Sequence, residues 1–458
     1  METIANINGF INDIVWSVPV LILILLTGIY FTIRLGGIQF LKFGTLFKGT
    51  VIKAFKKKDT EKPGPGELTS FQAAMTSVAA IVGSGNIAGV ATAIVLGGPG
   101  AVFWMIIAAL FGMASKFAEI ALGQKYREIK PDGTPTGGAM FYLSKGLHAR
   151  WLGVVFSILV IPFAFGISAI VDSNTIALTL QDYLNVPTIV TGIVLAVVTA
   201  FIILKGVSGV GYACSVVAPF MGGAYLLAGL LIIILNIGQV PAALGIMVKG
   251  AFNPSSVTGG VVGSILVTMK NGIARGLFSN EAGLGTTAMV HSSAKVKHPI
   301  EQAMWGPIEV FLDTIIVCLI SALSIVMSGL WTEGLDGASL TVAAFQKLLP
   351  GEIGTVICIL SVVLFGFSCL ISYYVYAERA LDFLSKGTSK KLIIRLIWCL
   401  GIFIGTQFEL ELAWDIADTI NGLMIIPNLI GILLLSKEVL ELKNDYFKSD
   451  RLPVHETK

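Results

Sequence analysis

The chain has 458 residues and a net charge of +3, with 55% hydrophobic and 13% charged residues. Its mean hydropathy is +0.84, and apolar runs of about 18 residues or more recur along it, each long enough to cross the hydrocarbon core of a bilayer. This composition excludes a soluble enzyme, a disordered chain and a nucleic-acid-binding protein. We expect an all-α integral membrane protein.

The apolar runs predict 11 transmembrane helices. The first run lacks the basic flank and the small-residue cleavage site of a signal peptide, so we expect it to remain as a span. The predicted spans are 14–33, 69–96, 100–123, 151–180, 187–204, 211–236, 257–291, 302–330, 351–380, 392–407 and 413–435.

Lysine and arginine predict the orientation of these spans. Basic residues gather in 34–62, after the first span, and then in alternate loops such as 125–150 and 386–395. Because cytoplasmic loops carry the excess of positive charge, we expect an N-terminus outside and a C-terminus in the cytoplasm. Residues 40–58 alternate apolar and basic side chains, which favours an amphipathic helix on the inner leaflet of the cell membrane over a calmodulin-like partner site.

The five cysteines and four histidines give no sign of a prosthetic group. Every cysteine lies in an apolar run, as expected for a small core residue. The histidines are scattered without the spacing of metal ligands. We therefore expect no metal cluster and no haem. The net charge of +3 and the lack of a soluble domain give no reason to expect a nucleic-acid partner, and we expect a monomer in the lipid bilayer.

Two spans are interrupted by clustered glycine and small polar residues. The second span contains GSGNIAG at 83–89, and the seventh contains RGLFSNEAGLG at 275–285. Each glycine costs about 1 kcal/mol against alanine inside a helix, so these clusters predict unwound backbone. Unpaired backbone must line a polar cavity rather than face lipid. The alternative is close helix packing through small residues.

The positions of the two interruptions favour an inverted repeat. Each begins a set of five spans, and sets with an odd number of spans have opposite orientations. We therefore divide the chain into an extra span with its linker, two repeats and a cytoplasmic tail, at residues 1–68, 69–236, 257–436 and 437–458.

Discontinuous helices bind ions through their freed backbone groups. Carbonyls at a half-helix C-terminus suit Na⁺ or an ammonium group, and amides at a half-helix N-terminus suit a carboxylate. A site with both kinds of end matches a zwitterionic amino acid. Glu281 is expected to lie in the first turn of such a half-helix.

Four long motifs carry a resemblance to a known family. GSGNIAGVATAIVLGGPGAVFW (83–104), RGLFSNEAGLG (275–285), FLDTIIVC (311–318) and WDIADTINGLMIIPNLIG (414–431) are similar to segments of the bacterial and archaeal alanine or glycine:cation symporters. The resemblance covers nearly the whole chain. It implies a leucine-transporter-like fold with ten core helices, alternating access, and Na⁺-coupled uptake of alanine or glycine.

The resemblance also implies which residues bind the substrate. The first broken helix would hold the charged ends of the amino acid, and the second would complete the pocket. The implied substrate-binding residues are Gly83, Ser84, Gly85, Asn86, Phe278, Asn280 and Gly283. Apart from the resemblance, Tyr373 in the ninth span is a candidate to cover the substrate pocket, while Tyr374 and Tyr376 are expected to pack against neighbouring helices.

Two sodium positions follow from the same resemblance. Asn86 matches the asparagine beside the substrate-linked ion in related folds. A second position would lie where the ninth span faces the first broken helix, at Ala79, Val82, Phe365, Ser368 and Cys369. Cys369 departs from the family, in which threonine is common, and a thiol is a poor Na⁺ ligand.

Asp172 in the fourth span is a second departure, because it stands where family members carry glutamine. An intramembrane carboxylate is costly enough to indicate function. It would contact the substrate or a cation, or titrate; alternatively, it lies near the outer interface, since it is 21 residues beyond Trp151. Contact would favour a cationic or otherwise modified amino acid.

Other charged residues within the spans allow two interpretations each. Glu309 and Asp313 share a helix face and either form a relay or bind neighbouring helices. Asp418, near the outer end of the last span, belongs either to a gate or to the solvated interface. Lys116 and Glu119 are expected to pair or to reach the cytoplasmic interface.

The sequence therefore predicts a Na⁺-coupled symporter for small neutral amino acids. The same fold with a cationic or glutamine-like substrate, or with H⁺ as the coupling ion, is the alternative that Asp172 and Cys369 raise. A channel would need a pore built by oligomeric symmetry, and an enzyme would need converging nucleophile, base or metal ligands. The sequence contains neither signature.

Overall fold

The computed structural model describes residues 2–56, 64, 66–253, 264–385, 391–407 and 411–448. The start of the predicted seventh span (257–263), part of the basic linker (57–63) and the end of the tail (449–458) lie outside the described residues. The described residues are mainly helical, with one antiparallel hairpin formed by β1 (Glu128–Ile129) and β2 (Pro135–Thr136).

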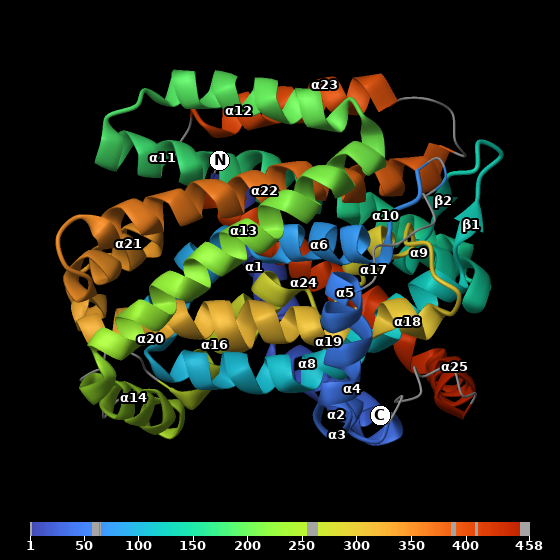
Figure 1. Cartoon of the computed structure of the whole chain (residues 1–458), viewed down its shortest axis with the longest axis horizontal. Helices are drawn as coiled ribbons and strands as arrows, with labels where there is room; N and C mark the ends of the chain where they lie inside the picture. The colour runs from blue at the N-terminus through green and yellow to red at the C-terminus, as the bar shows by residue number, and fades with distance from the viewer. Residues whose placement is uncertain are drawn as a thin grey trace.

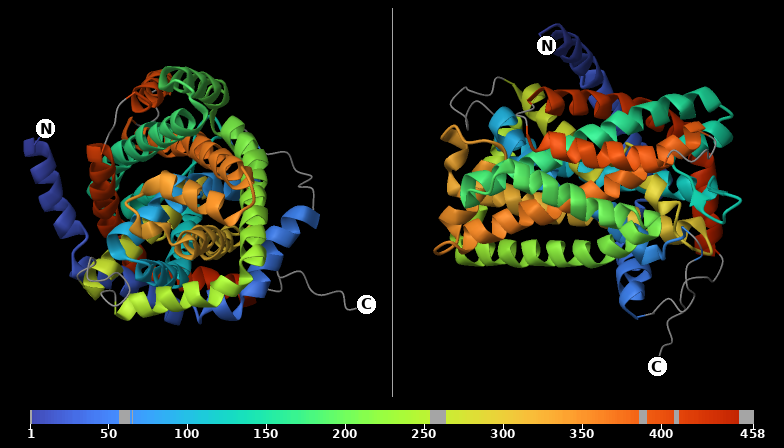
Figure 2. Two further views of the ribbon diagram at one scale, coloured as in Figure 1. Left: turned by 90° about the vertical axis from the view of Figure 1, so that its left-hand side faces the viewer. Right: turned by 90° about the horizontal axis from the view of Figure 1, so that it is seen from above.

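The N-terminal region contains a bent helix pair and a chain of short helices. Helix α1 projects away from the body (Figure 2) and meets α2 at an angle of 43°. The predicted amphipathic segment forms four short helical pieces. The elements are α1 (Glu2–Val15), α2 (Val18–Arg34), α3 (Ile38–Leu41), α4 (Phe43–Phe47), the π-helical turn η1 (Lys48–Ile52) and α5 (Lys53–Lys56).

The first predicted repeat contains a helix broken near its middle, and the break bends it by 47°. Its elements are α6 (Ser70–Ile81), η2 (Gly85–Gly89), α7 (Val90–Gly97), α8 (Gly100–Lys125), α9 (Ala139–Phe141), η3 (Tyr142–Gly146), α10 (Arg150–Ala164), η4 (Phe165–Asp172), α11 (Ser173–Leu184), α12 (Thr188–Ile203) and α13 (Gly206–Leu235). Of these, η2, η3 and η4 are π-helical.

The remaining elements include a second broken helix and two helices between predicted spans, α14 and α21. They are η5 (Ile237–Gln239), α14 (Val240–Phe252), α16 (Ile265–Asn280), α17 (Thr287–His291), α18 (Pro299–Ala303), α19 (Trp305–Val310), η6 (Phe311–Cys318), α20 (Leu319–Ser328), η7 (Leu330–Thr332), α21 (Gly337–Leu348), α22 (Ile353–Ser385), α23 (Lys391–Gly405), α24 (Glu411–Leu434) and α25 (Ser436–Lys448).

Six helices of the described chain are long and apolar enough to cross a membrane, or up to eight if each of two bent pairs counts as one span. The predicted number of 11 spans is larger. It includes α12 and α23, which have 16 and 15 residues, and the seventh span, which is interrupted. The exact number of spans therefore stays a prediction.

Local sequence signals explain where α6 and α20 begin or end. Thr69 forms a capping box with Gln72: the Thr69 hydroxyl accepts a hydrogen bond from the Gln72 amide, and the Gln72 side chain accepts one from the Thr69 amide. Gly329 ends α20 in the left-handed conformation, with φ of 72°.

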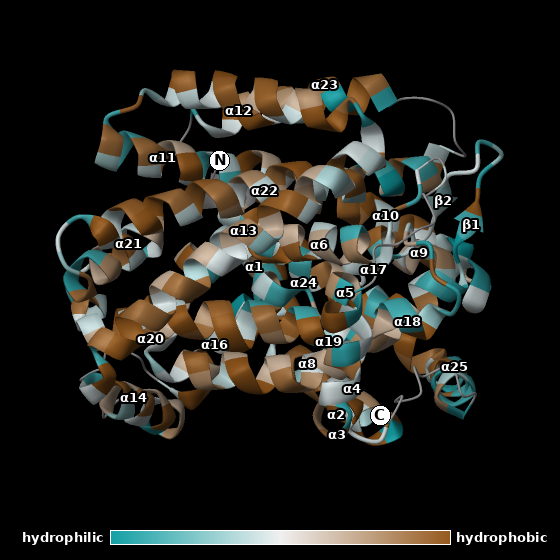
Figure 3. Ribbon diagram, viewed as in Figure 1, coloured by the Kyte–Doolittle hydropathy of each residue, from teal (hydrophilic) through white to brown (hydrophobic). Residues whose placement is uncertain are grey.

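The broken helices lie inside a shell of longer ones. Helix α8 packs along α16 and against α18 and α19, and α13 packs against α6 and α22 (Figure 1). Helices α12 and α23 pack together at the periphery. Hydropathy colouring is brown on these outer helices and teal around α25 and β1 (Figure 3). The polar groups of the two breaks are thus enclosed by apolar helices.

Candidate functional site

The first broken helix unwinds between Ile81 and Gly85, as its glycines predict. Val82 leaves helical geometry with φ of −83° and ψ of 87°. The Asn86 side chain then stabilises the break, because its Oδ1 accepts a hydrogen bond from the Gly83 amide at 2.8 Å. Gly83, Ser84 and Asn86 are all buried.

The second broken helix ends at Asn280 and resumes at Thr287. Glu281, Gly283 and Gly285 have positive φ values of 54°, 100° and 76°, a conformation that glycine adopts without a steric penalty. The Asn280 side chain accepts a hydrogen bond from the Ala282 amide at 3.0 Å. The two breaks are therefore stabilised in the same way, each by an asparagine oxygen.

Glu281 corrects one prediction. It does not lie in the first turn of a half-helix but follows the last residue of α16. Its carboxylate accepts hydrogen bonds from Thr286 at 2.6 Å, from Tyr376 at 3.2 Å and from Tyr373. The predicted pocket residue Tyr373 is thus attached to the second break through Glu281.

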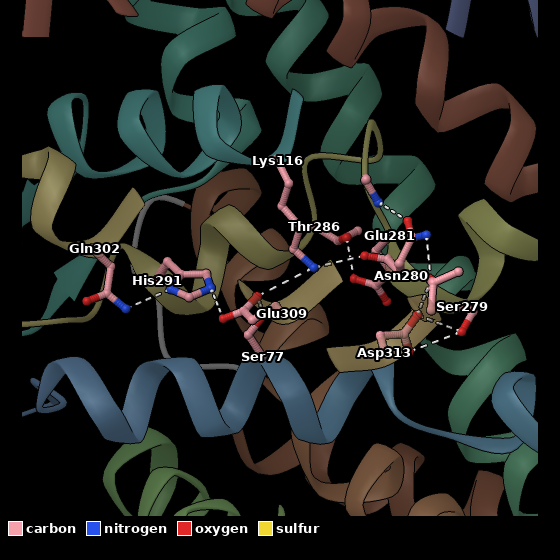
Figure 4. Close-up of polar contacts among 12 residues, drawn as sticks. Ser77, Lys116, Ser279, Asn280, Glu281, Thr286, His291, Gln302, Glu309 and Asp313 are labelled. Carbon is pink, nitrogen blue, oxygen red and sulfur yellow. Dashed lines mark hydrogen bonds and ion pairs between the residues drawn. The ribbon is translucent and has the colours of Figure 1, made fainter. Parts of the chain in front are cut away.

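Both breaks converge on one carboxylate, which we call the Asp313 cluster: Asn86, Ser279, Asn280, Asp313 and Thr314. Asp313 Oδ1 accepts from the Asn86 amide at 2.6 Å, and Oδ2 accepts from Ser279 at 2.9 Å and Thr314 at 2.8 Å. The Asn280 amide donates to the Thr314 hydroxyl at 2.9 Å. Of the two interpretations of Asp313, the structure supports binding to neighbouring helices. Figure 4 shows its contact with Ser279.

Asp172 faces the first break. It ends the π-helical stretch η4, is 1% exposed, and its Oδ1 accepts a hydrogen bond from Ser84 at 2.5 Å. Its Oδ2 has no hydrogen-bond partner among the described residues. The interface alternative is therefore wrong: Asp172 is buried beside the broken backbone.

The predicted second sodium residues meet between α6 and α22. The Ser368 hydroxyl lies 2.9 Å from the Ala79 carbonyl and 2.8 Å from the Phe365 carbonyl. The Cys369 thiol instead lies 3.3 Å from the carbonyl of Ala80. Two carbonyls and a hydroxyl are thus close together, and Val82 follows at the end of α6.

A closed layer lies on the side predicted to be outside. Phe278 stacks on Trp414 with ring centres 5.6 Å apart. Arg275 forms a two-point ion pair with Asp418, at 2.9 and 3.1 Å. Beyond this layer is a vestibule of about 610 Å³, which Arg275, Trp414 and the exposed Asp182 help to line. Asp418 therefore joins α24 to α16 through an ion pair, and its role in a gate stays a prediction.

Lys116 and Glu119 correct a second prediction, since both are fully buried and do not reach the interface. Lys116 donates to the Asn280 carbonyl at 2.8 Å. Glu119 accepts from Asn428 at 2.6 Å, and Asn428 also donates to the Gly283 carbonyl at 2.7 Å. Sequence reasoning missed these supports, although Asn428 lies inside one of the family motifs.

This arrangement can bind a cation and a small zwitterion together. Two buried helix breaks place backbone dipoles beside the carboxylates of Asp172 and Asp313, and an aromatic stack and an ion pair lie next to a vestibule. Such features define a secondary transporter with discontinuous helices. The sequence matches the sodium:alanine symporter family over residues 1–457. The chain belongs to this family, and is therefore a multi-pass membrane transporter that couples amino-acid movement to Na⁺.

Individual relatives agree with this assignment. The sodium/alanine symporter AgcS of Methanococcus maripaludis is 41% identical over 444 residues, which cover 95% of each chain. The probable sodium/glutamine symporter GlnT of Bacillus subtilis is 36% identical over 98% of this chain and 92% of its own. The crystal structure of MhsT with L-phenylalanine aligns with a TM-score of 0.61 at 14% identity, over 83% of this chain and 93% of that chain, which shows the fold.

Proposed function

We propose that this protein takes up alanine or glycine together with Na⁺ by alternating access. The observation that carries the proposal is the meeting of two broken helices at one buried carboxylate, Asp313. The family membership and the similarity to AgcS support the substrate class.

The proposed substrate site lies between the two breaks. Ser84 and Gly85 offer backbone groups from the first broken helix, beside Gly83, whose own amide is held by Asn86. Gly283 lies at the second break, where its carbonyl already accepts from Asn428. Phe278, Tyr373 and Asp172 border this space. A free amide attracts the substrate carboxylate, and a carbonyl or Asp172 attracts the ammonium group.

The proposed ion sites use oxygen ligands, which suit a hard monovalent cation. The first comprises Asn86 with the Asp313 cluster. The second comprises Ala79, Val82, Phe365 and Ser368, with Cys369 at its edge. We propose that the cation at the first site helps to neutralise the substrate carboxylate and so couples the two binding events.

The organisation of the protein is proposed on the same basis. Residues 69–236 and 257–436 form the inverted repeats, and 1–68 and 437–458 lie outside them. The N-terminus is outside and the C-terminus cytoplasmic, supported by the basic loops. We propose a monomer, because one chain contains both broken helices.

The second candidate is the same transport mechanism with a glutamine-like or cationic amino acid, or with H⁺ as the coupling ion. The unpartnered Oδ2 of the buried Asp172 favours it, since a side-chain amide or ammonium would satisfy that oxygen. The similarity to GlnT supports a larger polar substrate.

Transport by reconstituted protein tests the proposal. Proteoliposomes are given labelled alanine, glycine, glutamine or lysine under an imposed Na⁺, K⁺ or pH gradient. We expect alanine or glycine uptake that requires an inward Na⁺ gradient. Alanine uptake that ignores the Na⁺ gradient rejects the first candidate, and uptake driven by the pH gradient favours the second.

The asparagines that stabilise the breaks provide a second test. Asn86→Leu and Asn280→Leu are expected to abolish uptake, because leucine has no oxygen to hold the freed amides of Gly83 and Ala282. Size-exclusion profiles and helical content are expected to match the unsubstituted protein. Uptake above a tenth of the unsubstituted rate in both variants contradicts the proposed role of the breaks.

A further inference from the structure

The Glu309 carboxylate on α19 is a meeting point for three side chains outside the Asp313 cluster. Ser77 donates to Oε2 at 2.7 Å, Lys116 Nζ lies 3.5 Å from the same oxygen, and His291 Nε2 lies 2.9 Å from Oε1. All four residues are fully buried. The positive charge of Lys116 lies beside the negative charge of Glu309, so the loss of either partner would leave an uncompensated charge in the interior.

A row of polar contacts extends from Glu309 through His291 to the start of α6. The Gln302 amide nitrogen lies 2.8 Å from His291 Nδ1, and Gln302 Oε1 accepts from Ser70 at 2.7 Å. The Gln302 amide nitrogen can only donate, so His291 Nδ1 is the acceptor in this contact, and Nε2 is the ring nitrogen that lies beside Glu309. Trp305 in turn donates to Ser70 at 3.1 Å.

Two of these contacts attach α6, the first half of the broken helix, to its neighbours at two positions along its length. Ser70 binds Gln302, and Ser77 binds Glu309. Ser70 and Ser77 are seven residues apart in α6, and their partners Gln302 and Glu309 are also seven residues apart. Seven residues make two helical turns, or about 10 Å. Helix α6, which precedes the break, is therefore attached to α18 at its first residue and to α19 near its end.

Lys116 extends the connection to the second broken helix. Besides facing Glu309, it donates to the carbonyl of Asn280 at 2.8 Å. Asn280 is the last residue of α16 and a member of the Asp313 cluster. Figure 4 shows the row from Gln302 through His291, Glu309 and Lys116 to Asn280.

We propose that Glu309 is a positioning residue for transport: it joins α6 below the first break to the end of α16 at the second break. This inference rests on the proposed function. Glu309 does not contact the substrate in this scheme. It holds the two half-helices at the separation that the cation and substrate require, so that binding needs little additional ordering.

Removal of one of these hydrogen bonds tests the positioning role of Glu309. Ser77→Ala keeps the Lys116–Glu309 pair but removes the hydrogen bond from α6 to Glu309. We expect amide hydrogen exchange in residues 70–81 to rise at least fivefold while α8 is unchanged. We expect KM for substrate and for Na⁺ to rise three- to tenfold, with kcat within twofold, because fewer molecules have the binding-competent arrangement.

Matched variants separate positioning from general destabilisation. Ser77→Thr keeps a hydroxyl and is expected to restore both measurements. Ser324→Ala removes an equally buried hydroxyl that donates to the Ile320 carbonyl of its own helix, and is expected to change neither. Glu309→Gln removes the negative charge beside Lys116. Where this variant folds, its increases in hydrogen exchange and in KM are both expected to be larger than those of Ser77→Ala.

The proposal is overturned if Ser77→Ala matches Ser324→Ala in hydrogen exchange, or if exchange rises and KM does not. A fall in kcat alone also overturns it. The exchange measurement does not depend on transport. If the unsubstituted protein moves neither alanine nor glycine, the proposed function fails, while the exchange data still decide whether Ser77 and Glu309 hold α6.

Discussion

The backbone of Gly83 passes so close to α22 that no side chain fits there. A Cβ at Gly83 would lie 2.4 Å from the Cys369 sulfur, whereas a Cβ at Gly89 would have no neighbour within 4 Å. We expect Gly83→Ala to lower uptake at least tenfold and Gly89→Ala to leave it within twofold, measured as initial rates in proteoliposomes.

A second substitution checks the cause of that loss. Cys369→Ala removes the sulfur, so the double variant Gly83→Ala/Cys369→Ala is expected to recover at least half of the lost uptake. A double variant as inactive as Gly83→Ala would show that steric contact with Cys369 is not the reason for the glycine.

A separate prediction concerns the charge of Asp172. Asp172→Asn keeps the shape and the acceptor for Ser84 but removes the charge, and a charge-assisted hydrogen bond contributes about 1.5–3 kcal/mol. We expect KM for the transported amino acid to rise at least tenfold and the competition by glutamine and lysine to change. Asp182→Asn, an exposed acid on the same span, is the control. An unchanged competition profile would exclude Asp172 from the pocket.

We propose that helices α16 and α24 form the outer gate through one ion pair and one aromatic stack. Arg275→Lys cannot keep the two-point contact with Asp418, because lysine lacks the planar fork of arginine. We expect faster opening, seen as a three- to tenfold higher KM for external substrate and a melting temperature within about 3 °C of the unsubstituted protein. A KM within twofold would show that the pair does not control access.

Glycine spacing predicted the position of both breaks but not the role of each glycine. Gly283 and Gly285 have positive φ, as unwound backbone requires. Gly272 and Gly276 instead lie inside α16, where a Cβ would come within 2.1 Å of Ala101 and 3.0 Å of Met105. Close packing, the alternative interpretation, is therefore correct for these two. Composition alone cannot separate the two uses, because both select the smallest side chain.

Long-range partners explain what else the sequence could not predict. Lys116 lies nine residues before the end of α8, which suggested an interfacial charge, but its acceptor Asn280 is 164 residues away. Helix α21, between the predicted eighth and ninth spans, was also missed. It reaches the first break, where Thr341 donates to the Ile87 carbonyl at 2.9 Å. These contacts depend on the packing of the whole chain.

At the scale of the whole molecule, transport moves net charge across the membrane. A zwitterion carries none, so each coupled Na⁺ adds one inward charge, worth about 2.3 kcal/mol per 100 mV. One ion then raises substrate accumulation about 50-fold per 100 mV, and two ions raise it about 2,500-fold. The number of coupled ions can therefore be measured from the way in which equilibrium substrate accumulation depends on the imposed membrane potential.

We expect the logarithm of substrate accumulation, plotted against membrane potential, to have a slope of two charges for the unsubstituted protein, because we propose two separate ion sites: the Asp313 cluster and the group formed by Ala79, Phe365 and Ser368. Ser368→Ala removes the hydroxyl of the second group and is expected to reduce the slope towards one charge. Ser372 donates its hydroxyl to the Ser368 carbonyl, and the control variant Ser372→Ala is expected to keep a slope of two charges. A slope of one charge in all three proteins would leave the second group without an ion. If lysine is the substrate and the slope exceeds two charges, the cationic alternative replaces the neutral one, since the ammonium of the side chain then travels with the ions.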